Sequence, residues 1–346
     1  MRDISAFPGW SLRVFAAGRW LEPDAISILA VNARIPLRVL DNWVSGRSHR
    51  GLDKEEPIAM VMEVMRQDAI AQAPAAQGHS LRAAHAVSVI VALLAAGASL
   101  TGLLFPGVYH DKNWLAVAFG NDLVTLVVAV PVLVVALMLS ARGSVRGRMV
   151  WLGALYYMFY NYAFYVLGLP VTGLYLPLIA LFTLSAFALA LGLGSLDVQV
   201  ISRAFSFRTP ARLISVYMSI WAVIVGGLWI SQWVNFVFSG KIPEVNGDQN
   251  AYRVIATVDL SFMVSLLVPA ACWLWRRRPW GFPLAVMLNV QGVLYPTVMA
   301  MVCVFGWIAR PGSQLLSTWL VCCVVFCVAS ALCLCGLLLN VEKKRV

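Results

Sequence analysis

Two aspartates stand in long apolar stretches of the sequence, where an ionisable side chain is costly. Asp122 opens one such stretch, and Asp259 lies about one helical turn into another. A carboxyl group among apolar segments is a candidate for binding a proton or a cation. Each acid has an alternative structural role, because a carboxylate near a helix N-terminus caps free N–H groups and is favoured by the helix dipole.

Other polar residues are predicted to come near these acids from separate segments. Asn161 and Tyr165 fall in the outer half of one predicted span, Gln232 ends another, and His110 lies in the loop before Asp122. An imidazole exchanges protons near neutral pH. Gln291 belongs to a second polar set, in a later span. We interpret these residues as an outward-facing substrate- or ion-binding site, with hydrogen bonding between helices as the alternative.

The composition defines the solvent that surrounds these residues. The chain has 346 residues, of which 61% are hydrophobic and 12% charged, and its mean hydropathy is +0.80. Soluble domains carry about 25% charged residues, so this chain cannot cover its surface in water and belongs in the lipid bilayer. The predicted fold is all-α: a polytopic transmembrane helix bundle of about eight spans, with both termini cytoplasmic.

Apolar runs long enough to cross the hydrocarbon core, roughly 20 residues each, define the predicted spans. The transmembrane domain covers residues 84–339 and a basic cytoplasmic tail covers 340–346. The spans are predicted at about 84–105, 121–141, 149–168, 173–194, 211–231, 255–275, 281–304 and 316–339.

The N-terminal part of the chain differs from the rest, since it contains prolines and charges and no run long enough to span. We predict that residues 1–80 form a weakly ordered cytoplasmic extension, with one short helix near 53–71. No cleavable signal peptide is visible. A later start, at Met60, Met62 or Met65, remains open, so the sequence leaves undecided whether residues 1–59 are translated.

Basic residues alternate between the connections and predict the orientation. The net charge of the chain is +10. Its arginines and lysines are concentrated in every second connection between the predicted spans. The positive-inside rule then places these connections in the cytoplasm of a bacterial cell, at the inner membrane. We therefore attribute the positive charge to the membrane topology, and we predict no nucleic-acid partner. Tryptophans near the ends of the spans, among them Trp151 and Trp229, are predicted to be interfacial anchors.

Metal, cofactor and enzyme chemistry find little support. The seven cysteines lie in apolar runs without CxxC or Cys/His metal spacing, and no hydrolase or nucleotide-binding motif has supporting context. We therefore predict no metal, no cofactor and no enzymatic activity. A less favoured hypothesis is a membrane thiol/quinone redox protein, in which Cys303 meets Cys322 or Cys323.

Two stretches carry a resemblance to a known group of proteins. They are FGNDLVTLVVAVPVLVVALMLSARGS (119–144), which leads into GALYYMFYNYAFYVLG (153–168), and VDL (258–260), followed by LWRRRPWGFPLAVML (274–288). The chain resembles a family of uncharacterised bacterial integral membrane proteins over most of residues 84–310. The resemblance implies the fold and the location, and it implies no activity.

Two functions from different classes follow from these observations. The first is a proton- or ion-coupled transporter of small solutes, with Asp122 and Asp259 as its carriers. The alternative is a membrane sensor, scaffold or assembly partner that transports nothing. The halves 84–194 and 211–339 share no obvious motif, so the sequence neither supports nor excludes the internal repeats of many transporters.

Overall fold

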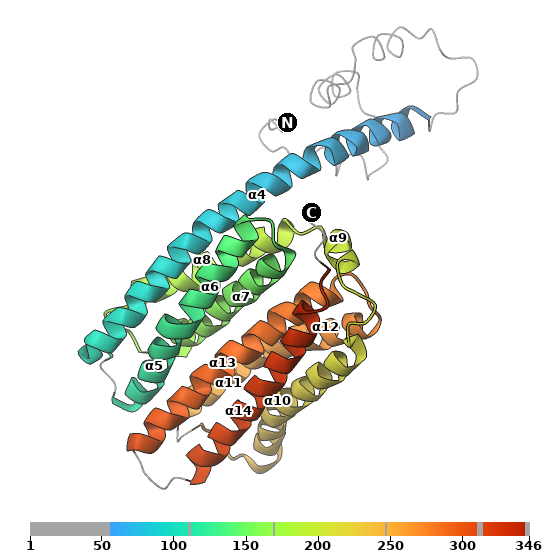
Figure 1. The fold of residues 1–346 in the computed structure, drawn as a ribbon. Coiled ribbons are helices and arrows are strands. Elements are labelled where there is room, and N and C mark those ends of the chain that lie inside the picture. Colours follow the sequence, from blue (N-terminus) through green and yellow to red (C-terminus); the bar gives the residue numbers. More distant parts are fainter. Residues whose placement is uncertain (1–55, 110–111, 169, 246–247, 310–313, 343–346) are drawn as a thin grey trace, which may run out of the picture. The chain divides into compact units, whose positions relative to one another are not determined.

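The computed structural model describes residues 56–109, 112–168, 170–245, 248–309 and 314–342. These residues are almost entirely helical, and their only extended pairings are two isolated bridges, Phe205–Val341 and Val245–Asp248. The prediction of an all-α fold is therefore confirmed (Figure 1). The chain divides into two compact units, residues 1–76 and 77–346. The helices discussed below belong to the second unit, except that the first of them, α4, begins in the first unit.

The first half of this unit contains four long helical rods. They are α4 (Glu56–Leu104), the rod formed by α5 (Lys112–Val124), η2 (Thr125–Ala129) and α6 (Val130–Ala141), then α7 (Val145–Gly168) and α8 (Tyr175–Gly194). A single 3₁₀ turn, η1 (Pro106–Val108), follows α4. The η2 segment is a π turn within a continuous helix, and Pro131 lies in the first turn of α6, two residues after η2 ends.

The second half repeats this order after a short connecting helix, α9 (Val198–Arg203). Its rods are α10 (Ala211–Ser239), the rod formed by α11 (Gln249–Val258), η3 (Asp259–Val264) and α12 (Ser265–Trp275), then α13 (Gly281–Ala309) and α14 (Gln314–Leu338). The η3 segment is also a π turn. The structure extends several predicted spans, among them 211–231, which runs on to Ser239, and 255–275, which begins already at Gln249.

Seven helices of the described residues are long and apolar enough to cross a membrane, which makes the chain a multi-pass membrane protein. Each of them overlaps one predicted span, and only the predicted span 149–168 has no counterpart among them. That segment forms α7, a helix of 24 residues whose tyrosines, asparagine and two arginines lower its apolar content. The stretch 56–71 and the first predicted span belong to one continuous helix, α4. The remainder of the predicted N-terminal extension, residues 1–55, lies outside the described residues.

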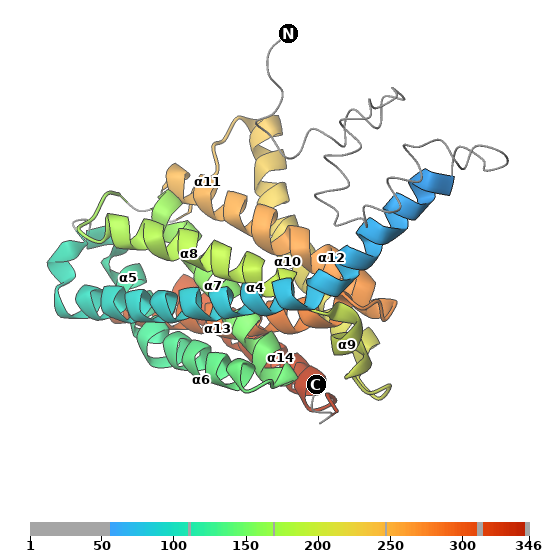
Figure 2. The same cartoon turned by 90° about the horizontal axis from the view of Figure 1, so that it is seen from above.

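Two helices form the core of the bundle. In α7, every residue from Trp151 to Ala163 is buried except the half-buried Phe159, so this helix is covered by protein on all sides. In α13, residues 281–292 are all buried, and α13 packs directly against α7. Figure 2 shows both helices within the bundle. A helix enclosed by other helices can carry polar groups that lipid would reject, which explains how α7 tolerates its composition.

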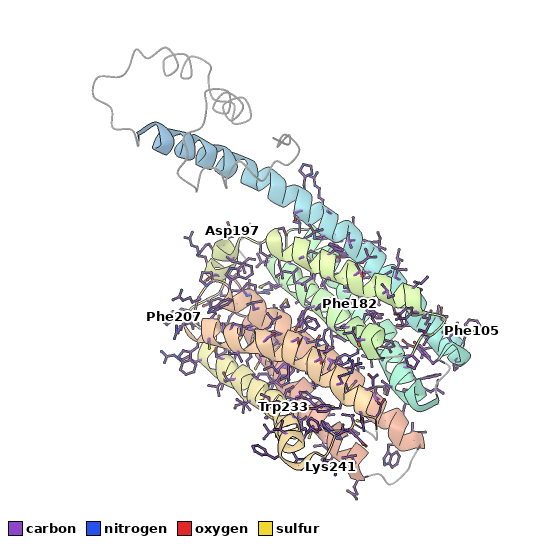
Figure 3. The ribbon with its side chains drawn as sticks, turned by 180° about the vertical axis from the view of Figure 1, so that it is seen from behind. Phe105, Phe182, Asp197, Phe207, Trp233 and Lys241 are labelled. Atoms are coloured by element: carbon purple, nitrogen blue, oxygen red, sulfur yellow. The ribbon has the colours of Figure 1, made fainter. Side chains whose placement is uncertain are left out.

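The basic connections meet at one end of the bundle. Arg148 Nη2 donates to the Ser195 carbonyl over 2.8 Å, and Arg277 Nη2 donates to the Phe207 carbonyl over 2.8 Å. The chain after α14 joins them, since Ser206 N donates to Asn340 O. Asp197 and Phe207 accordingly lie toward one end of the bundle, while Phe105 and Lys241 lie toward the other (Figure 3).

Candidate functional site

Both acids lie well inside their helical rods. Asp122 follows Lys112, the first residue of its rod, by ten residues, and Asp259 follows Gln249 by ten residues. At 1.5 Å per residue, each carboxyl stands roughly 15 Å along the rod from its start. The N-cap of α11 is Asp248, whose side chain accepts from Asn250 N over 2.8 Å. The capping alternative for Asp122 and Asp259 is therefore wrong.

Asp259 is buried and is held by two neutral donors from other helices. Trp229 of α10 donates its Nε1–H to Asp259 Oδ2 over 2.7 Å, and the Tyr160 hydroxyl of α7 donates to Oδ1. Tyr160 also packs edge-on against Tyr295, with ring centroids 5.0 Å apart. Among the described residues, no lysine, arginine or histidine hydrogen-bonds to this carboxyl. The position is thus a membrane-embedded acid without a fixed positive partner.

Asp122 is buried in a separate cluster with its own hydroxyl donor. The Tyr109 hydroxyl donates to Asp122 Oδ2 over 2.8 Å. Burial, followed by the charge of Asp122, raises the pKa of Tyr109, so this phenol keeps the proton that it donates. Helix α4 approaches closely at Gly102, where an added Cβ would lie 2.1 Å from Asp122 Oδ2. A side chain at position 102 would therefore displace the carboxyl.

A network of amides and hydroxyls extends from the residue before Asp122. Asn121 and Asn161 exchange two hydrogen bonds, of 2.7 Å and 3.1 Å, between α5 and α7. Thr125 donates to Asn121 Oδ1 over 2.9 Å and lies 3.0 Å from the Tyr157 hydroxyl. All four side chains are buried. The network joins the π turn of the first half to the central helix.

We expect the amide pair to contribute measurably to stability. Asn161→Leu leaves Asn121 Nδ2 without its partner, and Asn121→Leu leaves the Asn161 amide without its two bonds, so each single variant should lose about 1 kcal/mol of unfolding free energy. The double variant should lose less than the sum of the two, with a coupling of roughly 0.6 to 2 kcal/mol. Reversible unfolding in mixed micelles measures all four states of the cycle. Strict additivity would show that the pair contributes no interaction energy.

Helix α7 is the element that both acid clusters share. Tyr160 bonds Asp259, and the adjacent Asn161 bonds Asn121, the neighbour of Asp122. Consecutive residues of a helix diverge by about 100°, so the two clusters lie on different sides of α7. The structure thus brings the predicted residues Asp122, Asp259 and Asn161 around one helix, in two polar clusters.

The remaining predicted residues do not all join these clusters. Tyr165 is buried, and among the described residues its hydroxyl finds no hydrogen-bond partner. Gln232 is half-buried on α10, three residues past Trp229, and no side-chain hydrogen bond is found for it in the described ranges. Gln291 is fully buried on α13, and both its amide atoms lack partners there. His110 lies outside the described residues.

Several groups that hold the acids were missed by the sequence analysis. Trp229 and Trp151 were predicted to be interfacial anchors, but both are buried hydrogen-bond donors. Trp229 bonds Asp259, and Trp151 Nε1 donates to Ser88 Oγ over 3.0 Å. Tyr109 was also missed. The sequence offers no signal for these pairings, because the partners are 30, 63 and 13 positions apart on different segments.

The predicted meeting of outer cysteines is found for one pair. Cys303 on α13 and Cys323 on α14 lie close to each other, and both residues are buried. Cys322 is exposed on α14. Cys327 is engaged elsewhere, 3.3 Å from Thr297 Oγ1. Within the described residues, no group of three or more metal-ligating side chains is found.

Comparisons with protein-family models, with curated proteins and with solved structures gave no match for this chain. The class of protein is therefore defined by the helices and their buried acids alone: a multi-pass α-helical membrane protein.

Proposed function

We propose that this chain is a bacterial inner-membrane protein with eight spans and both termini in the cytoplasm. Seven spans are the apolar helices, and the eighth is α7, whose 24 residues reach about 36 Å at 1.5 Å each. The positive-inside rule assigns the end that holds Arg148 and Arg277 to the cytoplasm. The resemblance to uncharacterised bacterial integral membrane proteins is consistent with this assignment.

This topology leads to a prediction for chemical labelling. In a background without the seven native cysteines, single cysteines at Arg142 and Arg278 should react with a membrane-impermeant maleimide only in inverted vesicles. A cysteine at Lys241 should react only in intact cells whose outer membrane has been permeabilised. Labelling of positions 142 and 278 from opposite sides would overturn the proposed topology, because both belong to basic connections.

The proposed activity is proton-coupled transport of a small solute. The observation that carries it is a pair of buried carboxyl groups within apolar helical rods, each held by neutral donors and without a cationic partner among the described residues. A charged side chain in such a place is costly, and a proton is the smallest partner that removes the cost. A structural role would be served as well by an uncharged side chain of the same size.

The surroundings of Asp259 offer a way to couple a proton to a movement. An ionised carboxylate accepts from both Tyr160 and Trp229, whereas a protonated carboxyl must donate at one oxygen. Trp229 can only donate, while the Tyr160 hydroxyl can donate or accept. Protonation would therefore reverse the Asp259–Tyr160 bond and leave the Tyr160 proton to find another acceptor. Met263 Sδ lies 4.0 Å from that hydroxyl.

Reconstitution tests this activity. Purified protein in vesicles that enclose a pH-sensitive dye would be exposed to a panel of small amines, amino acids, carboxylates, sugars and polyols. We expect at least one solute to move protons with the wild-type protein, and Asp122→Asn or Asp259→Asn to abolish the movement. Proton-coupled flux that survives in both variants would show that neither acid is a carrier.

A sensor or scaffold is the second candidate function, and one observation favours it. Helix α10 continues past Trp229 to Ser239, and its large apolar residues from Ile230 to Phe238 are exposed within the described chain. Such a helix end offers a contact surface to a membrane partner. If no solute moves protons, and a crosslinker placed at Val237 captures a specific protein that is lost when Trp233→Ala is added, this function would replace transport.

A further inference from the structure

The two halves of the chain repeat each other at a fixed offset in residue number, first seen in the turns that follow the second rods. Arg142 and Arg276 end α6 and α12 with φ/ψ of −84°/9° and −83°/7°. The next residues, Gly143 and Arg277, both have positive φ, of 79° and 49°. Arg277 is the only non-glycine residue with positive φ among those described, which shows how strictly the turn is kept. The offset is therefore the difference in residue number between 142 and 276, and the same difference separates every pair of corresponding residues below.

The same offset relates two close backbone approaches. Gly147 lies in the first turn of α7 against the end of α6, where an added Cβ would lie 2.4 Å from Leu139 Cβ. Its counterpart, Gly281, begins α13 against the end of α12, where an added Cβ would lie 2.4 Å from Leu274 N. Both turns thus need a glycine at the same position.

The π turns and the buried faces follow this offset as well. The turn η2 starts at Thr125 and η3 starts at Asp259, which correspond in the two halves. The core-facing residues of α4 and α10 also correspond, each pair again separated by the same offset. These pairs are Ala84 with Met218, Ser88 with Ala222, Ala92 with Gly226 and Ala95 with Trp229.

The contacts between the halves are reciprocal. Helix α5 of the first half packs on α13 of the second, and α11 of the second half packs on α7 of the first. Helices α7 and α13, the third rods of their halves, pack on each other between these pairs. This is the pattern expected of two similar units related by a two-fold axis. Each unit has four rods, so both enter the bundle from the same side.

Beside the contact between α7 and α13, the repeat places an unsatisfied amide. Gln291 corresponds to Tyr157 of α7, because the same offset separates them. On α13 it lies next to Val290, which faces Gly153 of α7, and one turn before Tyr295, whose ring packs on Tyr160. Gln291 is 0% exposed, and neither Oε1 nor Nε2 has a hydrogen-bond partner in the described part of the chain.

An amide buried without partners is expensive, at about 1–3 kcal/mol for each unpaired group. Two residues away, the fully buried Asn289 also leaves its Oδ1 unpaired, although its Nδ2 donates to the Ala285 carbonyl over 2.8 Å. Tyr157, the counterpart of Gln291, is bound instead to Thr125. The interface of the repeats therefore keeps free hydrogen-bonding capacity on α13, one turn from the Tyr295–Tyr160 contact that leads to Asp259.

We propose that a small uncharged solute with hydroxyl or carboxamide groups binds beside the buried Gln291 amide of α13, which is its main hydrogen-bonding group. Free Oε1 accepts from such a solute and free Nε2 donates to it. The rings of Tyr160, Phe164 and Tyr295, which pack together at 5.0 to 5.7 Å, supply apolar contacts beside the amide. This assignment rests on the proposed transport function and names its substrate class. Asp259 would couple the proton to this solute.

Gln291→Met tests the proposal, since methionine fills a similar volume and carries no amide. If the amide is kept free for a solute, its removal should raise the midpoint of thermal unfolding in detergent by roughly 2 °C or more. The same variant should lose at least about tenfold in uptake of radiolabelled erythritol or acetamide by vesicles. Leu288→Met, a neighbouring change of one buried residue on α13 that removes no polar group, is the matched control.

Four results would overturn the proposal. A lower unfolding midpoint in Gln291→Met would show that the amide serves a structural hydrogen bond. Unchanged stability and unchanged uptake would indicate that the Gln291 amide hydrogen-bonds only to an ordered water. Uptake of charged solutes that depends on Asp259, without uptake of erythritol or acetamide, would leave the transport function standing and refute this substrate class. If no solute of either kind moves, both proposals fail.

Discussion

Asp259→Asn is expected to reduce proton-coupled solute flux by roughly a hundredfold or more. This is the effect of losing a positioned proton-transfer group. Asparagine has nearly the same shape and can still accept from Trp229, so the packing of η3 is retained, while the exchangeable proton is gone. Flux in reconstituted vesicles measures the effect, and tryptophan fluorescence reports whether the environment of Trp229 is preserved.

Asp248→Asn provides the matched control, because it makes the same chemical change at the start of the same rod. Asp248 is the N-cap of α11 and accepts from Asn250 N. Asparagine caps a helix about as well as aspartate, so stability and flux should remain at wild-type levels. Tyr160→Phe should give an intermediate loss, because it removes the hydroxyl that exchanges with Asp259. Equal flux in Asp259→Asn and Asp248→Asn would refute the role of Asp259.

Gly153→Leu is expected to prevent the protein from accumulating in a folded state. An added Cβ at position 153 would lie 2.6 Å from Val290 Cβ, at the contact between the two central helices. Real Cβ atoms do not approach this closely, and both helices are buried on all sides, so neither can move away without separating the halves. Overpacking of a well-packed core costs about 1–3 kcal/mol for added methylenes, and leucine adds four carbons. Size-exclusion chromatography of solubilised protein measures the loss.

Gly97→Leu is the control for this prediction. Gly97 lies on α4, a helix of the same bundle, and an added Cβ there meets nothing within 4 Å. The substitution should leave the yield unchanged or raise it, since glycine is a poorer helix former than leucine by several tenths of a kcal/mol. Equal yields of the Gly153 and Gly97 variants would show that α7 and α13 do not depend on this close contact.

The local features of the chain were predictable from the sequence. Apolar stretches mark the spans because each must by itself exclude water over the width of the bilayer, and hydropathy is a property of consecutive residues. The segment 149–168 shows where this argument weakens. Its polar residues lower its hydropathy because α7 is enclosed by protein and is selected for contacts with other helices instead of contacts with lipid.

The sequence also located the two buried acids, since a carboxyl group in an apolar run can be recognised without knowledge of its neighbours in the fold. The sequence could not decide whether each acid caps a helix or lies within it, because that depends on where the helix begins. The rods extend ten residues before Asp122 and Asp259, through segments such as Gln249–Val258 whose polar residues delay an apolar signal. The groups that hold the acids come from distant segments, so no spacing in the chain could indicate them.

The repeat of the two halves shows the same division. Position pairs such as Thr125 with Asp259 and Tyr157 with Gln291 share geometry but not residue type, so comparison of the halves as strings of letters reveals nothing. Turn dihedrals, close approaches and buried faces reveal the repeat because packing constrains backbone shape more strictly than it constrains side-chain identity.

The sequence alone therefore determined the solvent, the class of fold and the approximate positions of the spans, because these follow from the composition of consecutive residues. Tertiary structure decided which helices are central, which donors hold Asp122 and Asp259, and that the Gln291 amide is buried without a partner in the described part of the chain. Those properties depend on contacts between residues far apart in the chain, and such contacts exist only once the rods have packed.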